Sequence, residues 1–95
     1  MDRILCAAIW FKDGEKYNHQ PKNIETGFVI AGRRHHNCVL TLDILGKRSS
    51  EIKAHEQGFI TSDDMFVDRK EAAKIAYTIG QTKKLESPLF SEDLY

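Results

Sequence analysis

The sequence has no excess of charge of either sign and no long hydrophobic run. Its 14 lysines and arginines balance 14 aspartates and glutamates, so no overall electrostatic field attracts DNA, RNA or an anionic membrane. The apolar run at residues 4–11 is shorter than a membrane-spanning helix requires, and the residues before it lack the cleavage pattern of a secretory signal. We therefore expect a cytoplasmic protein without membrane or nucleic-acid polymer partners, in which any anion site is local.

Cysteine is also scarce. The two residues, Cys6 and Cys38, are far apart in the sequence and lack CxxC spacing, and a reducing cytoplasm keeps such residues as thiols. The simplest interpretation is two small buried hydrophobic side chains, with a disulfide or a reactive thiol as the alternatives.

The chain is long enough for one small domain and not for two. It has 95 residues, of which 41% are hydrophobic, and it contains no internal repeat, low-complexity tract or change in composition. Residues 1–95 are therefore expected to form a single α+β domain in which three to four strands pack against two helices. Residues 81–95 include several apolar side chains, and we expect them to form a C-terminal tail that docks on this domain or on a second subunit.

Four apolar segments predict the strands of the domain. Residues 4–10 are nearly all apolar, which is typical of a strand covered on both faces. Residues 27–31 predict a second strand, and residues 57–61 and 65–67 predict a hairpin. The polar stretch at 12–25 predicts a long loop between the first two strands.

Two segments predict helices. The clearer one begins with a capping box from Asp68 to Glu71 and continues with apolar residues at helical spacing to a stop at Gly80. Residues 36–45 fit two patterns, because they combine strand-like alternation with a helical apolar stripe. We favour a helix there, since the run is long for a strand and Gly46 is followed by two cations, as at many helix C-termini.

The segment at residues 32–38, GRRHHNC, has the densest set of reactive side chains. It follows the predicted second strand, where side chains point into a crevice and a following helix adds N–H groups that suit an anion. Paired imidazoles can exchange protons with an attacking and a leaving oxygen, while guanidinium groups stabilise the phosphate charge. The pattern predicts a phosphate-facing site. Its catalytic residues are His35 and His36, and its ligand contacts include Arg33, Arg34 and Asn37.

Adjacent side chains in an extended segment point in opposite directions, so an extended segment would let only one of His35 and His36 face the ligand. In that case His19 or His55 supplies the second imidazole. The alternative is that the histidines form no ligand site. In that case His36 caps the helix or packs in the fold, and His35 faces solvent. Zinc is disfavoured because His35, His36 and Cys38 are too close in sequence to converge on one tetrahedral ion, and the neighbouring arginines repel a cation. No metal and no other cofactor is expected.

A second group of candidates surrounds the predicted hairpin and the last helix. A phenylalanine there would stack on a base, a glutamine would read the base edge, and an arginine near a helix start would pair with phosphate. The structural alternative has the phenylalanines in the core and the arginine solvated. The further predicted ligand contacts are Gln57, Phe59, Ser62, Phe66 and Arg69, together with His19 from the loop.

With these segments in view, the chain resembles a family of small phage and prophage proteins. The resemblance covers nearly the whole chain and rests on six segments. They read HQPKNIETG at 19–27, GRRHHNC at 32–38, QGFITS at 57–62, FVDRKEA at 66–72, GQ at 80–81 and SEDLY at 91–95. The resemblance implies action in an infected bacterium, where many small phage proteins counter host defence. Several of these cleave or sequester nucleotide immune signals, including cyclic dinucleotides and ADP-ribose derivatives.

Three hypotheses follow from the candidate residues and the resemblance together. The first is a counter-defence enzyme, a metal-independent phosphodiesterase that cleaves a cyclic dinucleotide, and the paired imidazoles favour it slightly. The second is a non-catalytic sponge that sequesters a cyclic nucleotide or an ADP-ribose-type signal in a pocket shared within a homo-oligomer. The third is an inhibitor of a host protein that acts through the apolar tail. The first two have a nucleotide second messenger as their partner.

Overall fold

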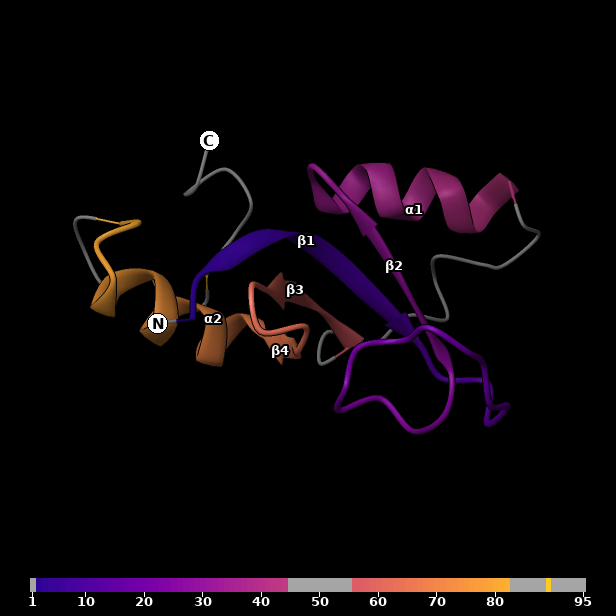
Figure 1. The fold of residues 1–95 in the computed structure, drawn as a ribbon. Helices are drawn as coiled ribbons and strands as arrows, with labels where there is room; N and C mark the ends of the chain where they lie inside the picture. The colour runs from indigo at the N-terminus through magenta and orange to yellow at the C-terminus, as the bar shows by residue number, and fades with distance from the viewer. Residues whose placement is uncertain (1, 45–55, 83–88, 90–95) are drawn as a thin grey trace.

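The structure is a computed structural model that describes residues 2–44, 56–82 and 89. Figure 1 shows how its strands and helices are arranged. The elements are β1 (Ile4–Phe11), β2 (Phe28–Gly32), α1 (His35–Ile44), β3 (Gln57–Thr61), β4 (Phe66–Asp68) and α2 (Arg69–Thr78). The expected α+β class, with up to four strands and two helices, is confirmed.

β1 is a central strand of an antiparallel sheet with the order β2-β1-β3-β4. Its residue Ala8 pairs with Ala31 of β2 on one side and with Gly58 of β3 on the other. β4 extends the sheet beyond β3, where Phe59 pairs with Val67. β1 is apolar at nearly every residue because both of its faces are also covered, one by the helices and the other by the loop between β1 and β2.

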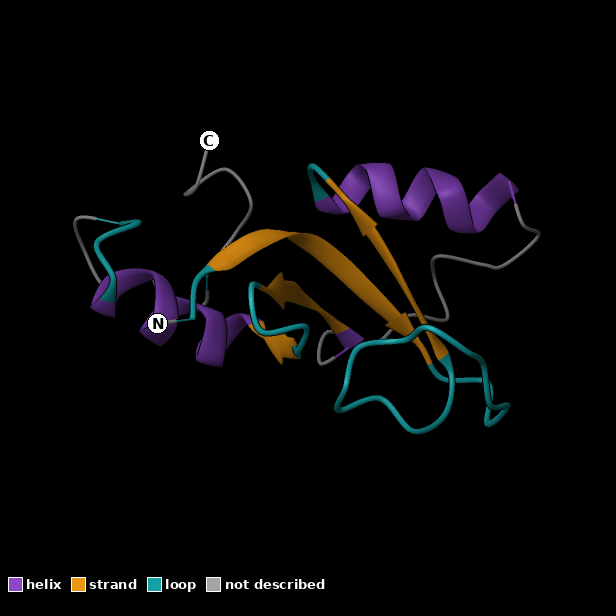
Figure 2. Cartoon of the chain, in the orientation of Figure 1, coloured by secondary structure: helices purple, strands orange, loops and turns teal. Residues whose placement is uncertain are grey.

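Both helices pack on the same face of the sheet. α1 lies against β1 and β2, where Leu42 forms a core cluster with Ile9. α2 lies against β3 and β4, where Ala72 forms a second cluster with Phe59. Phe59 pairs with Ala7, which is two residues before Ile9, so both clusters are on one face. Figure 2 shows the two helices at opposite ends of the sheet.

A bulge at Leu5 brings the start of β1 into the same core. Ile4 pairs with Thr61 and Cys6 pairs with Ile60, so Leu5 is an extra residue in this register. The extra residue reverses the alternation of side chains. Ile4 therefore faces α2 and is 3% exposed, whereas Leu5 is 52% exposed.

The opposite face of the sheet is covered by the loop between β1 and β2, residues 12–27, rather than by a helix. Ile24 of this loop forms a core cluster with Ala8 and Phe66, and Trp10 packs against it. The rings of Trp10 and Phe66 meet edge to face, with centroids 5.9 Å apart. The long loop expected from the sequence is therefore one layer of the fold.

Two amide side chains attach this loop to the two edges of the sheet. Asn23 accepts a hydrogen bond from the Phe66 N–H at 2.8 Å and donates one to the Phe66 carbonyl at 2.6 Å, as a neighbouring strand would. Gln20 accepts a hydrogen bond from the Val29 N–H in the other edge strand at 2.8 Å. These bonds satisfy backbone groups that edge strands otherwise expose.

A third amide closes the sheet at the start of β1. The Gln81 side chain accepts from the Ile4 N–H and donates to the Ile4 carbonyl, both at 2.8 Å. Gly80 has a φ of +80°. This left-handed conformation turns the chain back after α2, so that Gln81 reaches β1.

β2 begins at Phe28, one residue later than expected. Gly27 has a φ of +78°, and a Cβ at this position would lie 2.5 Å from the Phe11 carbonyl oxygen and 2.7 Å from Trp10 Nε1. Glycine is therefore required at the turn where the loop returns to the sheet.

Both predicted helices are present. Asp68 is the N-cap of α2, and its carboxylate accepts a 2.8 Å hydrogen bond from the Glu71 N–H. The predicted capping residue is therefore confirmed. α1 is a helix rather than a strand and begins at His35. Its expected end at residues 45–46 lies outside the described residues.

The structure describes Leu89 from the segment after Thr82. Leu89 is fully buried in the cluster that contains Phe59 and Ala72, and its N–H donates to the Arg69 carbonyl at 3.1 Å. The rest of the expected tail lies outside the described residues, so docking of the complete segment stays a prediction.

We expect Asn23→Ala to lower the free energy of unfolding by about 1–3 kcal/mol, because the Phe66 N–H and carbonyl lose their amide partner. Chemical denaturation followed by circular dichroism measures this change. Asn18→Ala is the matched control, because Asn18 is an exposed residue of the same loop, and we expect it to change the stability by less than about 0.5 kcal/mol. Equal effects of the two substitutions would contradict the role assigned to Asn23.

Candidate functional site

The turn from β2 into α1 is tight. At Gly32 a Cβ would lie 3.2 Å from Asn37 Cβ and 3.3 Å from Cys38 Sγ, so the absence of a side chain lets the first turn of α1 lie against the strand. The turn is closed by a reciprocal pair of hydrogen bonds. The Arg34 N–H donates to Asn37 Oδ1 at 3.1 Å, and the Asn37 N–H donates to the Arg34 carbonyl at 3.0 Å.

The two adjacent histidines have different environments. His35 is 9% exposed, and its Nε2 lies 2.8 Å from the Gly58 carbonyl oxygen in β3. Because a carbonyl can only accept, this bond requires the proton on Nε2. The His35 ring also meets the Phe59 ring edge to face, with centroids 5.0 Å apart. His36 is exposed at the next position of α1. This arrangement is the reverse of the sequence-based alternative in which His36 packs and His35 faces solvent.

The surface around the start of α1 is cationic. We call it the α1 N-terminal patch and define it by Arg33, Arg34, His36 and Asn37. Arg33, His36 and Asn37 are exposed, and Arg34 is half-buried. The first-turn N–H groups and the positive end of the helix dipole lie at the same place. The patch therefore combines cationic side chains with backbone donors suited to an anion.

Three residues of the second predicted group lie on β3 and at the start of α2. The Arg69 guanidinium donates to Gln57 Oε1 at 2.9 Å, and Phe59 is fully buried against the His35 ring. Gln57 and Arg69 are half-buried. Phe59 therefore contacts His35 at the start of α1, whereas Gln57 joins β3 to Arg69 at the start of α2.

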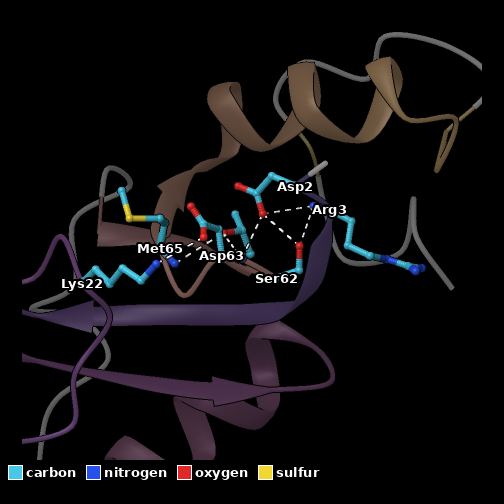
Figure 3. A network of polar contacts seen from close by, with 7 residues as sticks. Asp2, Arg3, Lys22, Ser62, Asp63 and Met65 are labelled. Atoms are coloured by element: carbon cyan, nitrogen blue, oxygen red, sulfur yellow. Dashed lines mark hydrogen bonds and ion pairs between the residues drawn. The ribbon is translucent and has the colours of Figure 1, made fainter.

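The other three predicted contacts lie elsewhere. Phe66 is buried on the opposite face of the sheet, with Trp10 and Ile24. His19 is exposed in the loop 12–27, next to Gln20 at the β2 edge. Ser62 follows the far end of β3, where it belongs to a polar network around the N-terminus (Figure 3). His55, the alternative second imidazole, lies outside the described residues.

Asp2 is at the centre of this network, and no sequence pattern pointed to it. Its Oδ1 accepts hydrogen bonds from the Ser62 hydroxyl at 3.0 Å, the Asp63 N–H at 3.0 Å and the Arg3 N–H at 3.1 Å (Figure 3). Partial desolvation raises the pKa of Asp2, but the hydrogen bonds from Ser62, Thr61 and the two N–H groups outweigh it. The pKa therefore lies below its ordinary value of 3.8.

An open groove of about 270 Å³ lies next to this network, along the outer side of α2. Its lining residues are Asp2, Glu71, Lys74, Ile75, Thr78 and Ile79. Two carboxylates and one ammonium group give the groove no net attraction for phosphate. An anion is therefore better matched by the α1 N-terminal patch than by this groove.

The cysteines are poorly placed for chemistry. Cys38 is fully buried, and its Sγ lies 3.9 Å from the Ala7 carbonyl oxygen and 3.7 Å from that of Arg34. Burial, with a smaller effect of Cys6, raises the pKa of Cys38 to about 11. Burial also raises the pKa of Cys6. Both residues are free thiols, and raised pKa values disfavour the thiolate that a nucleophile or a metal ligand requires.

The model of the phage T4 y16D protein family matches residues 3–95. The chain belongs to this family. The match includes the α1 N-terminal patch, the loop 12–27 with its two amide anchors, and Gln81, whereas Asp2 lies just before it. The expectation of a small phage protein is therefore confirmed at the level of the family.

No curated protein and no solved structure matches the chain. Within residues 2–44, 56–82 and 89, no helix has the length and apolar character needed to cross a bilayer. The same residues contain no cluster of three histidine, cysteine or acidic side chains that could hold a metal ion. The roles predicted for the individual site residues stay predictions.

We expect His35→Ala to lower the free energy of unfolding by about 2–4 kcal/mol, because it leaves the buried Gly58 carbonyl without its donor and removes the ring that packs on Phe59. His36→Ala is the matched control, and because His36 is exposed we expect a change within about 0.5 kcal/mol. Denaturant titration of the two variants tests this difference. A small effect of His35→Ala would show that the imidazole is not structural.

The lowered pKa of Asp2 predicts a pH dependence of stability. The hydrogen bonds to the ionised carboxylate contribute fully above the ordinary pKa of 3.8, and this contribution is lost as the pH falls through the lowered pKa. We therefore expect the parent protein to melt at a higher temperature than Asp2→Asn at neutral pH, and the two melting temperatures to converge as the pH is lowered past 3.8. Asp64→Asn is the control, since that side chain lies outside the network, and a difference that does not depend on pH would contradict the assignment.

Proposed function

We propose that this phage protein binds a nucleotide immune signal of the host at the α1 N-terminal patch and holds it without cleaving it. The proposed ligand is a cyclic dinucleotide or an ADP-ribose-type compound, and the proposed place of action is the cytoplasm of the infected bacterium. One observation carries the preference for binding over cleavage. The His35 imidazole is buried, with its Nε2 2.8 Å from the Gly58 carbonyl oxygen.

Cleavage by paired imidazoles requires one ring to accept a proton and another to donate one, both within reach of the same phosphodiester. His35 is bonded to β3 inside the protein, whereas His36 faces solvent from the next position of α1. Use of both rings on one ligand would require His35 to leave the core and break its bond to Gly58. The geometry therefore supports sequestration better, and cleavage is the alternative outcome of the experiment below.

The patch supports phosphate as the anchoring group of the ligand. Arg33 is exposed just before α1 and His36 is exposed at its second position, where guanidinium and imidazole can donate hydrogen bonds to phosphate oxygens. The N–H groups of Arg34 and Asn37 are already bonded within the turn, so in this proposal the other N–H groups of the first helical turn add donors of fixed direction. Arg69 and Gln57 are hydrogen-bonded to each other, so in this proposal they do not contact the ligand.

The test is to incubate the purified protein with cyclic dinucleotides and ADP-ribose compounds and to follow each by chromatography and mass spectrometry, before and after heat denaturation. Removal of one compound from solution, followed by its intact release on heating, supports sequestration. Conversion to a linear product would overturn it in favour of a phosphodiesterase. If no compound changes, the nucleotide proposal fails and a host protein becomes the better candidate target.

We expect the double variant Arg33→Ala, His36→Ala to bind the captured compound at least about tenfold more weakly, because it loses two charge-assisted contacts. Isothermal titration calorimetry with that compound measures the change. Arg3→Ala is the matched control, because Arg3 is an exposed arginine outside the patch and belongs to the network around the N-terminus (Figure 3). Unchanged affinity of the double variant, or an equal loss in Arg3→Ala, would contradict the assignment of the site.

A further inference from the structure

We propose that the groove along the outer side of α2 binds a small aliphatic amine, which is a ligand with one ammonium group on a short alkyl chain. We call this surface the α2 groove, and its volume is about 270 Å³. Most of its lining residues lie three or four positions apart, which places them on one face of a helix. They are Glu71, Lys74, Ile75, Thr78 and Ile79, and Asp2, which precedes β1, completes the lining. None of them belongs to the α1 N-terminal patch, so this proposal does not depend on the proposed function.

The apolar part of the α2 groove is formed by Ile75 and Ile79. Both side chains are half-buried, and Ile75 packs against the core cluster that contains Ala72 and Phe59. Ile79 is held by its N–H, which donates to the Ile75 carbonyl at 3.1 Å. An alkyl chain that lies over these two side chains is removed from water without breaking a hydrogen bond of the protein.

Asp2 provides the anionic contact for the ammonium group. The three hydrogen bonds that this carboxylate accepts from Arg3, Ser62 and Asp63 all go to Oδ1. Its other oxygen lies on the side of α2 (Figure 3). The pKa of Asp2 is below its ordinary value of 3.8, so the carboxylate is ionised at neutral pH. A charge-assisted hydrogen bond from an ammonium group to this second oxygen is therefore possible while the network stays intact.

The charges and the size of the α2 groove favour a small cation. Asp2 and Glu71 carry negative charges and Lys74 carries a positive one, so one ammonium group neutralises the excess. Within the described part of the chain, the one ion pair joins Lys22 to Asp63, so a neighbouring cation does not neutralise either carboxylate of the groove. A volume of about 270 Å³ is near the lower limit for small-molecule sites, and it matches a chain of a few carbon atoms.

Nuclear magnetic resonance titration of the isotope-labelled full chain with pentylamine at neutral pH tests the proposal. We expect the amide signals of Ile75, Thr78 and Ile79 to shift, with a Kd on the order of 1–10 mM for so small a ligand. Pentanol, which lacks the charge, and pentanoate, which reverses it, should each bind at least about threefold more weakly. Absence of these shifts, or equally tight binding of pentanoate, would overturn the proposal.

Substitution of the two opposite charges should change the affinity in opposite directions, which a purely structural role of these residues would not do. Asp2→Asn should weaken pentylamine binding about threefold to fivefold, because the anionic contact is lost. Lys74→Gln should strengthen it about twofold, because a repelling ammonium group is removed. Glu25→Gln is the matched control, since Glu25 is an exposed carboxylate of the loop 12–27, and it should leave the affinity unchanged. Weaker binding to Lys74→Gln would contradict an amine as the ligand.

The compound Nα-acetyl-lysine methylamide carries the same alkylammonium chain on peptide groups, and it tests whether the ligand is a free amine. We expect it to bind more weakly than pentylamine, because its peptide groups would lose water next to the apolar side chains. Tighter binding would overturn the assignment in favour of a lysine side chain of a partner protein. None of these assays contains a nucleotide, so their failure would leave the test of the proposed function unaffected.

Discussion

Hydrogen bonds from side-chain amides to the backbone of the sheet fasten the loop 12–27 and the segment after α2 to this protein's sheet. Asn23 pairs with Phe66 as a strand would, and Gln81 does the same with Ile4 across 77 positions of sequence. Gln20 adds a bond to β2 at the other edge. Polar groups at the rim of a sheet must find partners in water or in the protein. Here amides supply them, and the bonds also fasten the loop 12–27 over a face that has no helix.

The same kind of bond determines what the candidate site can do. His35 donates to the Gly58 carbonyl and thereby ties the start of α1 to β3. The adjacent histidines consequently have separate environments, since His35 is inside the fold and His36 is on its surface. The turn from Gly32 is tight and is closed by Asn37. The backbone that carries the neighbouring cationic residues is therefore held in one conformation. Such pre-organisation suits capture of an anion, since less ordering entropy is lost on binding.

Much of the local structure followed from short-range patterns. The Asp68 cap predicted the start of α2, the apolar run predicted β1, and the apolar stripe together with Gly46 favoured a helix after β2. Phe59 and Phe66, the two alternatives for stacking on a base, lie on opposite faces of the sheet. Successive residues of a strand point to opposite faces of the sheet, so the face on which a residue lies depends on the register of pairing. A bulge such as that at Leu5 shifts the register and reverses the faces beyond it.

The sequence by itself determined the elements of this phage protein, their order and the segment that carries its cationic residues. Caps, turns and periodicity act over a few positions and can be read locally. The tertiary structure decided which histidine is buried, which predicted contacts share a face, and which polar residues hold the fold. These outcomes depend on bonds between distant positions, such as His35 with Gly58 and Asn23 with Phe66. Adjacent helical residues are about 100° apart, so burial of His35 rather than His36 was decided by the way α1 packs on the sheet.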